Sequence, residues 1–262
     1  MPLLMSYTGL SVASEAVPKT SAPQPVAVFM ETRPTPWTDT PRVVVYSDGS
    51  VLYADGISER RYWGIRYDYR STKVIPVEYR RMLLNWQPIW DVPNHGFANL
   101  SDIDHIATAV FVVVQGTKTK TYAVRGLDCE ISPEQAPHAN IYSQLPSGVL
   151  ELHQSLCNMS FAGAQKWTPD KIEVQLRQHL GPTTDAFLWP KTWPSLSSRM
   201  AKRVFRGYSI TLDGEVLTEL KNLIGDKHSP QHVRLAARDW TINYREVFPG
   251  EPIWRKAISG KL

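Results

Sequence analysis

Runs of apolar residues interrupted by turn residues recur along the chain and predict short β-strands. In the clearest case, residues 42–46 (RVVVY) and 51–53 (VLY) flank an Asp-Gly pair at residues 48–49. Glycine supplies the positive φ that a tight turn needs, so this pattern predicts a β-hairpin. An apolar run at residues 26–30 predicts a strand before the hairpin, and the alternating aromatic and polar residues 61–69 predict one after it.

Stripes of apolar residues at helical spacing predict about three amphipathic helices. Pro76 suits the first position of a helix, where its missing N–H would have no partner, and the apolar residues that follow at spacings of three and four share one face. Pro88 ends this pattern. Residues 146–159 carry a second stripe, and residues 213–224 carry a third, followed by Gly225 at a position that favours glycine.

Two further hairpins and two single strands complete the predicted elements. The hairpins cover residues 106–124 and 233–247, and the second is expected to turn at residues 238–239. The single strands cover residues 172–176 and 204–212. Together these elements predict an α+β fold class, built mostly from antiparallel hairpins.

The order strand, helix, loop, hairpin occurs twice along the chain. It covers residues 61–124 and again residues 204–247, which suggests two β-α-β-β halves. We therefore divide the chain into a disordered leader or signal remnant (residues 1–25), an N-terminal β-rich half (residues 26–140) and a C-terminal α+β half (residues 141–262). The alternative is that both halves form one compact unit.

The first residues leave two interpretations open. Residues 1–16 contain small and apolar residues but lack the basic segment and the clean apolar core of a signal peptide, so they are either a signal remnant or a plain leader. Residues 17–25 (VPKTSAPQP) have the composition of a tether. The longest apolar runs in the chain, such as residues 110–114, are much shorter than the ~20 residues of a transmembrane helix, so we expect no transmembrane segment.

Composition and charge are those of a folded protein with a mild basic excess. Hydrophobic residues make up 42% and charged residues 21%, and the net charge is +4 from 29 basic and 25 acidic residues. Such an excess favours acidic partners only weakly. The densest basic stretch, residues 199–206, is short for a nucleic-acid arm, which would usually be longer and carry aromatic residues placed for stacking on bases, so we interpret it as a solvated basic face.

Two cysteines, Cys129 and Cys157, are too few for a disulfide scaffold, and the chain has no Cys-x-x-Cys metal motif. They could form one disulfide that closes a loop of nearly thirty residues. In an oxidising compartment this bridge would add ~3 kcal/mol of stability. The alternative is two buried free thiols.

A loop rich in aspartate and histidine is the strongest candidate for chemistry. Three carboxylates and two imidazoles in this loop could bind a divalent metal or act as acid–base pairs; they belong to Asp91, His95, Asp102, Asp104 and His105. The same residues suit a plain loop before a strand, because Asp and Asn form turns with their own backbone. We favour the plain loop and expect no catalytic residue, metal or cofactor.

Other catalytic patterns are weak or missing. His228 and His232 have the spacing of a helical zinc pair, but Pro230 lies between them and argues against a helix. The chain has no Gly-x-Ser-x-Gly elbow, no P-loop and no dinucleotide-binding glycine motif.

Aromatic residues offer candidate binding surfaces. Trp189 and Trp193, each followed by proline, could stack on sugar rings or anchor a protein partner if their rings are exposed; buried rings would instead fix the loop to the core. Tyr62 and Trp63 in the aromatic strand could contribute to a partner-binding face in the same way.

Three segments resemble the layout of uncharacterised exported or lipid-anchored bacterial proteins. They are VVVYSDGSVLYADG, WDVPNHGFANLSDIDHIATAVFVVV and DWTINYREVFPGE, and the resemblance extends over roughly two thirds of the chain. It implies a location in the bacterial envelope and brings no catalytic residues. The chain departs from that group by having no clear signal peptide and no lipobox cysteine near its start.

Our preferred hypothesis is a non-enzymatic bacterial protein of the periplasm or envelope that binds another protein, such as an inhibitor or immunity-type partner. Hairpin edges and abundant aromatic residues favour it, because edge strands can recruit a partner strand. One alternative is a metal-assisted hydrolase that uses the Asp/His loop. Another is a carbohydrate or cell-wall binder that uses exposed tryptophans, and the cytoplasm is the alternative location.

Overall fold

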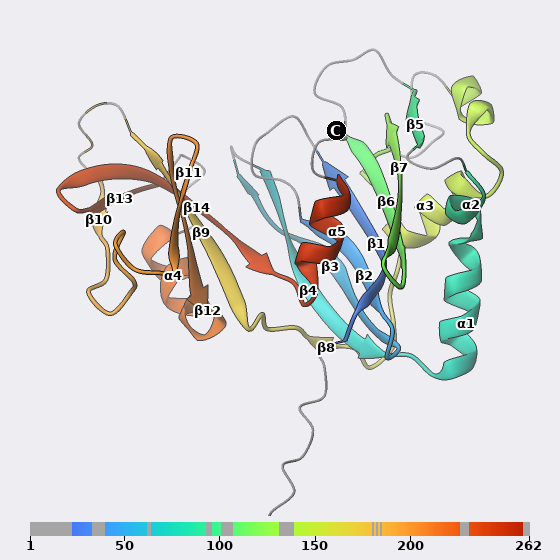
Figure 1. Ribbon diagram of the computed structural model, residues 1–262, viewed down its shortest axis with the longest axis horizontal. Helices are drawn as coiled ribbons and strands as arrows, with labels where there is room; N and C mark the ends of the chain where they lie inside the picture. The colour runs from blue at the N-terminus through green and yellow to red at the C-terminus, as the bar shows by residue number, and fades with distance from the viewer. Residues whose placement is uncertain are drawn as a thin grey trace, which may run out of the picture.

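In the computed structural model, the described residues form two β-sheets and five α-helices, which is the α+β class predicted from the sequence (Figure 1). The structure describes residues 23–32, 40–61, 64–92, 96–100, 107–130, 139–179, 181, 183, 185–225 and 231–258. No helix among these residues has the length and apolar character needed to cross a membrane.

The larger sheet has eight strands in the order β5-β7-β6-β1-β2-β3-β4-β8. Its neighbours pair antiparallel except β5 and β7, which are parallel. The strands are β1 (Pro25–Thr32), β2 (Pro41–Tyr46), β3 (Ser50–Arg61), β4 (Gly64–Lys73), β5 (Gly96–Asn99), β6 (Thr108–Gln115), β7 (Lys118–Arg125) and β8 (Gln165–Lys166).

Helices cover both faces of this larger sheet, which explains why its central strands are almost continuously apolar. On one face, Phe29 and Phe111 pack with α1 (Pro76–Asn85), α2 (Gln87–Asp91), the 3-10 helix η1 (Ala139–Gln144) and α3 (Val149–Cys157). On the other face lies α5 (Glu251–Ile258) (Figure 1). Its Trp254 is fully buried, and Val28 and Val112 pack with it.

The smaller sheet has six strands in the order β10-β13-β14-β9-β12-β11. Its core face carries Val174, Ile210 and Ile242, which pack with α4 (Leu217–Ile224). The strands and the 3-10 helix before α4 are β9 (Lys171–Gln178), β10 (Phe187–Leu188), β11 (Ala201–Val204), β12 (Gly207–Asp213), η2 (Gly214–Val216), β13 (Gln231–Leu235) and β14 (Arg238–Val247). After β14 the chain returns to the larger sheet as α5.

The Asp-Gly hairpin and the helix at Pro76 are confirmed. Strands β2 and β3 pair with Val43 opposite Tyr53, and Gly49 adopts φ +84° in the turn between them. Helix α1 begins at Pro76, and α2 follows it in place of the end expected at Pro88.

Three local features differ from the predictions. The strand predicted at residues 204–212 is mostly confirmed as β12 (Gly207–Asp213), but it excludes Val204, which ends β11, because the chain turns at Phe205 and Arg206, with Arg206 at φ +57°. The turn of the last hairpin lies at Ala236 and Ala237, both at positive φ, and not at residues 238–239. Helix α5 was not among the predicted helices.

The division into halves at residues 140–141 does not follow the packing of the two sheets. Helices α3 and α5, both assigned to the C-terminal half, pack on the larger sheet. The repeated element order also differs in space, since β1, β2 and β3 separate β4 from β6, whereas β9 and β14 separate β12 from β13. The apolar stripe of α3 packs on a sheet face whose strands are distant from α3 in the sequence. The order of elements along the chain does not reveal this packing.

Candidate functional site

Of the five candidate residues in the Asp/His loop, the structure describes Asp91. Asp91 is exposed at the end of α2, where its Oδ1 accepts a hydrogen bond of 2.7 Å from Nε2 of Gln87. The other four candidates, His95, Asp102, Asp104 and His105, lie outside the described residues, as do Tyr62, Trp63 and His228. His232 lies on β13, with its ring 4.2 Å from that of His179.

Trp189 and Trp193 form no exposed aromatic platform, so the prediction that they bind a partner or a sugar was wrong. The two residues are 8% and 6% exposed, and their rings meet edge to face at an interplanar angle of 88°. Trp189 Nε1 donates to the carbonyl oxygen of Pro194, and Trp193 Nε1 donates to Oε2 of Glu219. Burying both indoles stabilises the loop more than exposing them would, because each ring covers a large apolar area of the core.

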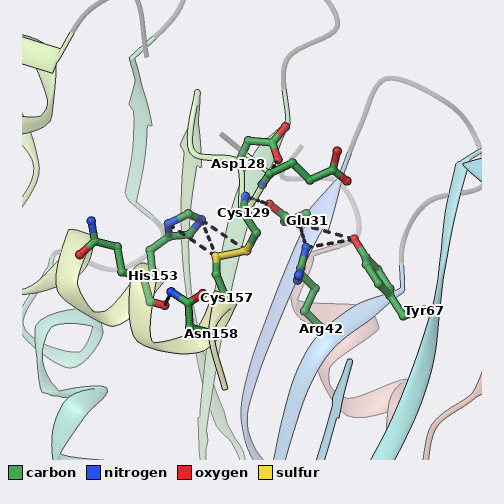
Figure 2. The surroundings of a disulfide bond; sticks show 10 residues. Glu31, Arg42, Tyr67, Asp128, Cys129, His153, Cys157 and Asn158 are labelled. Atoms are coloured by element: carbon green, nitrogen blue, oxygen red, sulfur yellow. Dashed lines mark hydrogen bonds and ion pairs between the residues drawn. A yellow bond between two sulfur atoms is a disulfide. The ribbon is translucent and has the colours of Figure 1, made fainter. Parts of the chain in front are cut away.

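A disulfide between Cys129 and Cys157 joins the segment after β7 to the end of α3 (Figure 2). His153 lies one helical turn before Cys157, and this spacing places both side chains on the same face of α3. The His153 Nε2 atom is 3.5 Å from the Cys157 sulfur and 3.9 Å from the Cys129 sulfur. Nδ1 of His153 is also 3.9 Å from the Cys157 sulfur, so this sulfur lies beside the ring, near both of its nitrogens.

His153 is buried in an apolar and aromatic environment. It is 4% exposed, and its ring meets those of Phe29 and Phe111 at centroid distances of 5.5 and 6.5 Å. Burial, together with the nearby charge of Arg42, lowers the pKa of His153 to about 4. The ring is therefore neutral at neutral pH. The sequence contained one signal for this residue, which is its position within the apolar stripe of residues 146–159.

A buried ion pair lies beside the disulfide (Figure 2). Arg42 on β2 donates from Nη1 to Oε2 of Glu31 on β1 at 2.7 Å, and the N–H of Cys129 donates to Oε1 of the same carboxylate at 2.6 Å. The Arg42 guanidinium also lies over the ring of Tyr67, 4.8 Å from its centroid. Burial raises the pKa of Glu31, and Arg42 and the Cys129 N–H offset part of that rise. This network fixes the Cys129 segment to the centre of the sheet.

The acid sensitivity of the fold should report on the buried imidazole. We expect the free energy of unfolding to fall by about 3 kcal/mol more in the wild type than in His153→Leu between pH 7 and pH 4. The unfolded chain takes up a proton on this imidazole near its ordinary pKa of 6.5, whereas the folded chain excludes it until about pH 4. The stability that comes from keeping this imidazole neutral is therefore fully present above its pKa in the unfolded chain. It is lost as the pH falls toward its pKa in the folded chain.

Urea unfolding at several pH values measures this difference between the two proteins. Glu31, whose folded pKa is raised, contributes with the opposite sign, but it is present in both proteins and cancels in the comparison. Arg42, whose charge acts on the imidazole, is likewise unchanged. Parallel stability curves for the two proteins would contradict the prediction.

The hairpin formed by β11 and β12 is the second candidate site. Strand β11 is at the edge of the smaller sheet and pairs with β12. Phe205 in its turn is 83% exposed, and the Arg206 guanidinium lies 5.0 Å from the centroid of that ring. Lys202 and Arg203 are exposed on the strand itself. An aromatic ring, an open strand edge and several positive charges thus occur within a few residues.

The basic side chains of the hairpin form no ion pair with a carboxylate among the described residues. None of the ion pairs between described residues involves Lys202, Arg203 or Arg206, whereas Arg234 and Arg245 have carboxylate partners. Burial and the neighbouring Arg206 together lower the pKa of Arg177 on β9, so positive charges are close together at this end of the sheet. Such a surface is suited to a negatively charged partner.

Comparisons with known proteins add nothing to the interpretation, which therefore depends on the residues described above. No protein-family model matches the chain, and neither a curated protein nor a solved structure matches it at a significant level.

Proposed function

We propose that this chain is a non-enzymatic bacterial binding protein, an inhibitor or immunity-type partner that takes up an extended acidic segment of another protein along the outer edge of β11. The observation that carries the proposal is the β11–β12 hairpin, which presents the exposed basic residues Lys202 and Arg203 on an edge strand and the exposed Phe205 in its turn. The proposal that Asp91 and the other residues of the Asp/His loop form a hydrolytic site remains a prediction from the sequence.

The open edge of β11 favours a peptide as the ligand. Its four residues pair with β12 on one side, from Ala201 opposite Ile210 to Val204 opposite Gly207. On the other side, main-chain groups can pair with an added strand, which gives affinity without requiring a particular sequence. A nucleic acid offers no such main-chain pairing, so the edge favours a protein partner.

Phe205 and the basic residues supply specificity. Aromatic and arginine side chains are enriched at interface hot spots, where an aromatic anchor is surrounded by polar contacts. Lys202 and Val204 lie on one face of the strand, and Arg203 lies on the other, because successive side chains alternate. An acidic strand paired with β11 would therefore meet positive charges on both of its faces.

The periplasm or envelope is the proposed location. Disulfides persist mainly in oxidising compartments, and the Cys129–Cys157 bridge is consistent with one. The resemblance to exported or lipid-anchored bacterial proteins supports the same location.

Fluorescence anisotropy with a labelled peptide of alternating Glu and Val tests the proposed function. We expect this peptide to bind, and we expect Phe205→Ala to weaken binding about tenfold, because removing a hot-spot side chain typically costs more than 1 kcal/mol. Reversing the charge with Lys202→Glu and Arg203→Glu should shift the preference to a Lys-Val peptide. Backbone N-methylation of alternate peptide residues should abolish binding, because it removes the donors of the added strand.

Leu188→Ala is the matched control, because Leu188 is 72% exposed on β10 at the opposite edge of the same sheet. This variant should bind the acidic peptide as the wild type does. Equal binding of the Glu-Val and Lys-Val peptides would refute the proposal. A preference for single-stranded oligonucleotides, included as a separate arm, would replace the protein partner by a nucleic acid.

A further inference from the structure

We propose that the reduced form of this protein binds a thiophilic metal cation through Cys129, His153 and Cys157, and that the disulfide and the metal exclude one another. The inference is independent of the β11–β12 hairpin, which belongs to the other sheet. It starts from a set of three donor atoms that lie within 4.8 Å of one another.

The distances around His153 already suit a shared metal ion. With metal–sulfur bonds of about 2.3 Å and metal–nitrogen bonds of about 2.0–2.1 Å, tetrahedral zinc places sulfur and nitrogen about 3.5 Å apart. The Nε2 atom of His153 is 3.5 Å from one sulfur and 3.9 Å from the other. Once the bond between them is reduced, the two sulfur atoms must separate to about 3.8 Å. The ring must also turn, because Nδ1 is 3.9 Å from the Cys157 sulfur and a metal ion on Nε2 would hold that sulfur farther from Nδ1.

The protein holds the three residues in place by means other than the disulfide. His153 and Cys157 are on one face of α3, whose apolar residues Val149, Leu152 and Leu156 are buried. Cys129 is held by the hydrogen bond from its N–H to Glu31. The two cysteine Cα atoms are 5.3 Å apart, so rotation of the side chains can separate the sulfurs while the backbone stays in place.

The partners of the imidazole distinguish this arrangement from a histidine that only fills the core. Buried polar atoms almost always have a polar partner, such as a carbonyl group or a carboxylate. Among the described residues, the atoms in hydrogen-bonding range of the His153 nitrogens are the two sulfurs. An imidazole placed toward two cysteine sulfurs provides the nitrogen of a Cys₂His ligand set.

The redox and proton balance is simple. A dithiol or phosphine reductant supplies two electrons and breaks the sulfur–sulfur bond, and two protons complete the thiols of Cys129 and Cys157. Binding of the metal then releases both protons, because thiolates are the ligands, and leaves the oxidation state of the metal unchanged. A disulfide oxidant that accepts two electrons restores the bond and expels the metal.

Two cations fit this donor set. Zn²⁺ would use the three protein ligands and solvent in a fourth position, whereas Cu⁺ is stable with three soft ligands. Their shared chemistry is affinity for thiolate, so hard cations such as Mg²⁺ should not compete.

The test titrates the full-length chain anaerobically after reduction with a phosphine and removal of the reductant. We expect one Co²⁺ or Zn²⁺ per chain, with a thiolate-to-cobalt charge-transfer band in the Co²⁺ arm, and a separate arm measures Cu⁺ by competition with a chromogenic chelator. His153→Gln should weaken binding at least tenfold, and Cys157→Ser should abolish the charge-transfer band. Bound metal should also protect both cysteines from alkylation.

His232→Gln is the matched control, since it removes a partly buried imidazole from the other sheet and should leave metal affinity unchanged. Circular dichroism of each reduced variant verifies that the fold is kept. Failure of the folded, reduced wild type to bind any of the three metals would overturn the proposal. Binding that persists in the oxidised protein, or is equal in His153→Gln, would also overturn it.

Discussion

Replacing Arg42 by methionine is expected to lower the free energy of unfolding by about 3–5 kcal/mol at pH 7, because it leaves a buried carboxylate without its cation. Glu31 is 5% exposed, and its remaining strong hydrogen bond comes from the N–H of Cys129. Methionine keeps much of the apolar stem that packs near Tyr67, so the loss reports mainly on charge. Urea unfolding followed by circular dichroism measures the change.

The pH dependence of this loss has a definite sign. Arg42 lowers the pKa of Glu31, so its removal raises that pKa further above the value in the unfolded chain. A group with a raised folded pKa stabilises the fold at low pH and loses this contribution as the pH rises. The deficit of Arg42→Met relative to the wild type should therefore shrink from pH 8 to pH 4.

Two further variants identify the carboxylate as the cause. The double variant Glu31→Gln/Arg42→Met should regain most of the lost stability, because no unpaired charge remains in the core. Arg70→Met removes the cation of a more exposed ion pair, that with Asp55 on the same sheet, and should cost far less than Arg42→Met, because solvent screens this pair. Similar losses for Arg42→Met and Arg70→Met would show that the buried pair has no special role.

Elements fixed by local chemistry were predictable from the sequence. The β2–β3 hairpin depends on the turn around Gly49, and α1 depends on Pro76 and the stripe that follows it. Each signal lies within a few residues of the structure that it specifies. The hairpin of β11 and β12 shows the limit, because Arg206 takes the positive φ of its turn without being glycine. Gly207 follows Arg206, and its lack of a side chain is needed for close packing and not for the turn. A Cβ there would lie 1.8 Å from the carbonyl oxygen of Leu176 on the neighbouring strand β9.

The candidate sites depend on contacts that no local pattern reveals. Glu31 meets Arg42 because β1 is next to β2, and it meets Cys129, distant in sequence, because β1 is also next to β6, which precedes β7. Trp189 and Trp193 show the same limit, because their residue type allowed either an exposed binding surface or burial in the core. The fold buries both rings. Sequence spacing identified which residue types were available, but only the order of strands in the sheets determined their neighbours.

Removing the disulfide with Cys129→Ala and Cys157→Ala together is expected to lower the free energy of unfolding by about 3.5 kcal/mol. The bridge joins residues separated by 28 positions, and in the chain-entropy model it restricts the unfolded chain by this amount. For a chain of this size, such a loss corresponds to a fall of about 10 °C in Tm. Native circular dichroism should be unchanged, because α3 and the Glu31–Cys129 hydrogen bond remain.

Reduced wild type, kept metal-free with a chelator, should show the same loss as the double variant. Adding Zn²⁺ should then restore part of the stability of the reduced wild type, since a ligand that binds the folded state stabilises it by mass action. The double variant lacks both thiolates and should gain nothing from Zn²⁺. If reduction and the double substitution both left stability unchanged, the bridge would not constrain the unfolded chain. If Zn²⁺ stabilised both proteins equally, the stabilising metal would be bound elsewhere than at the two cysteines.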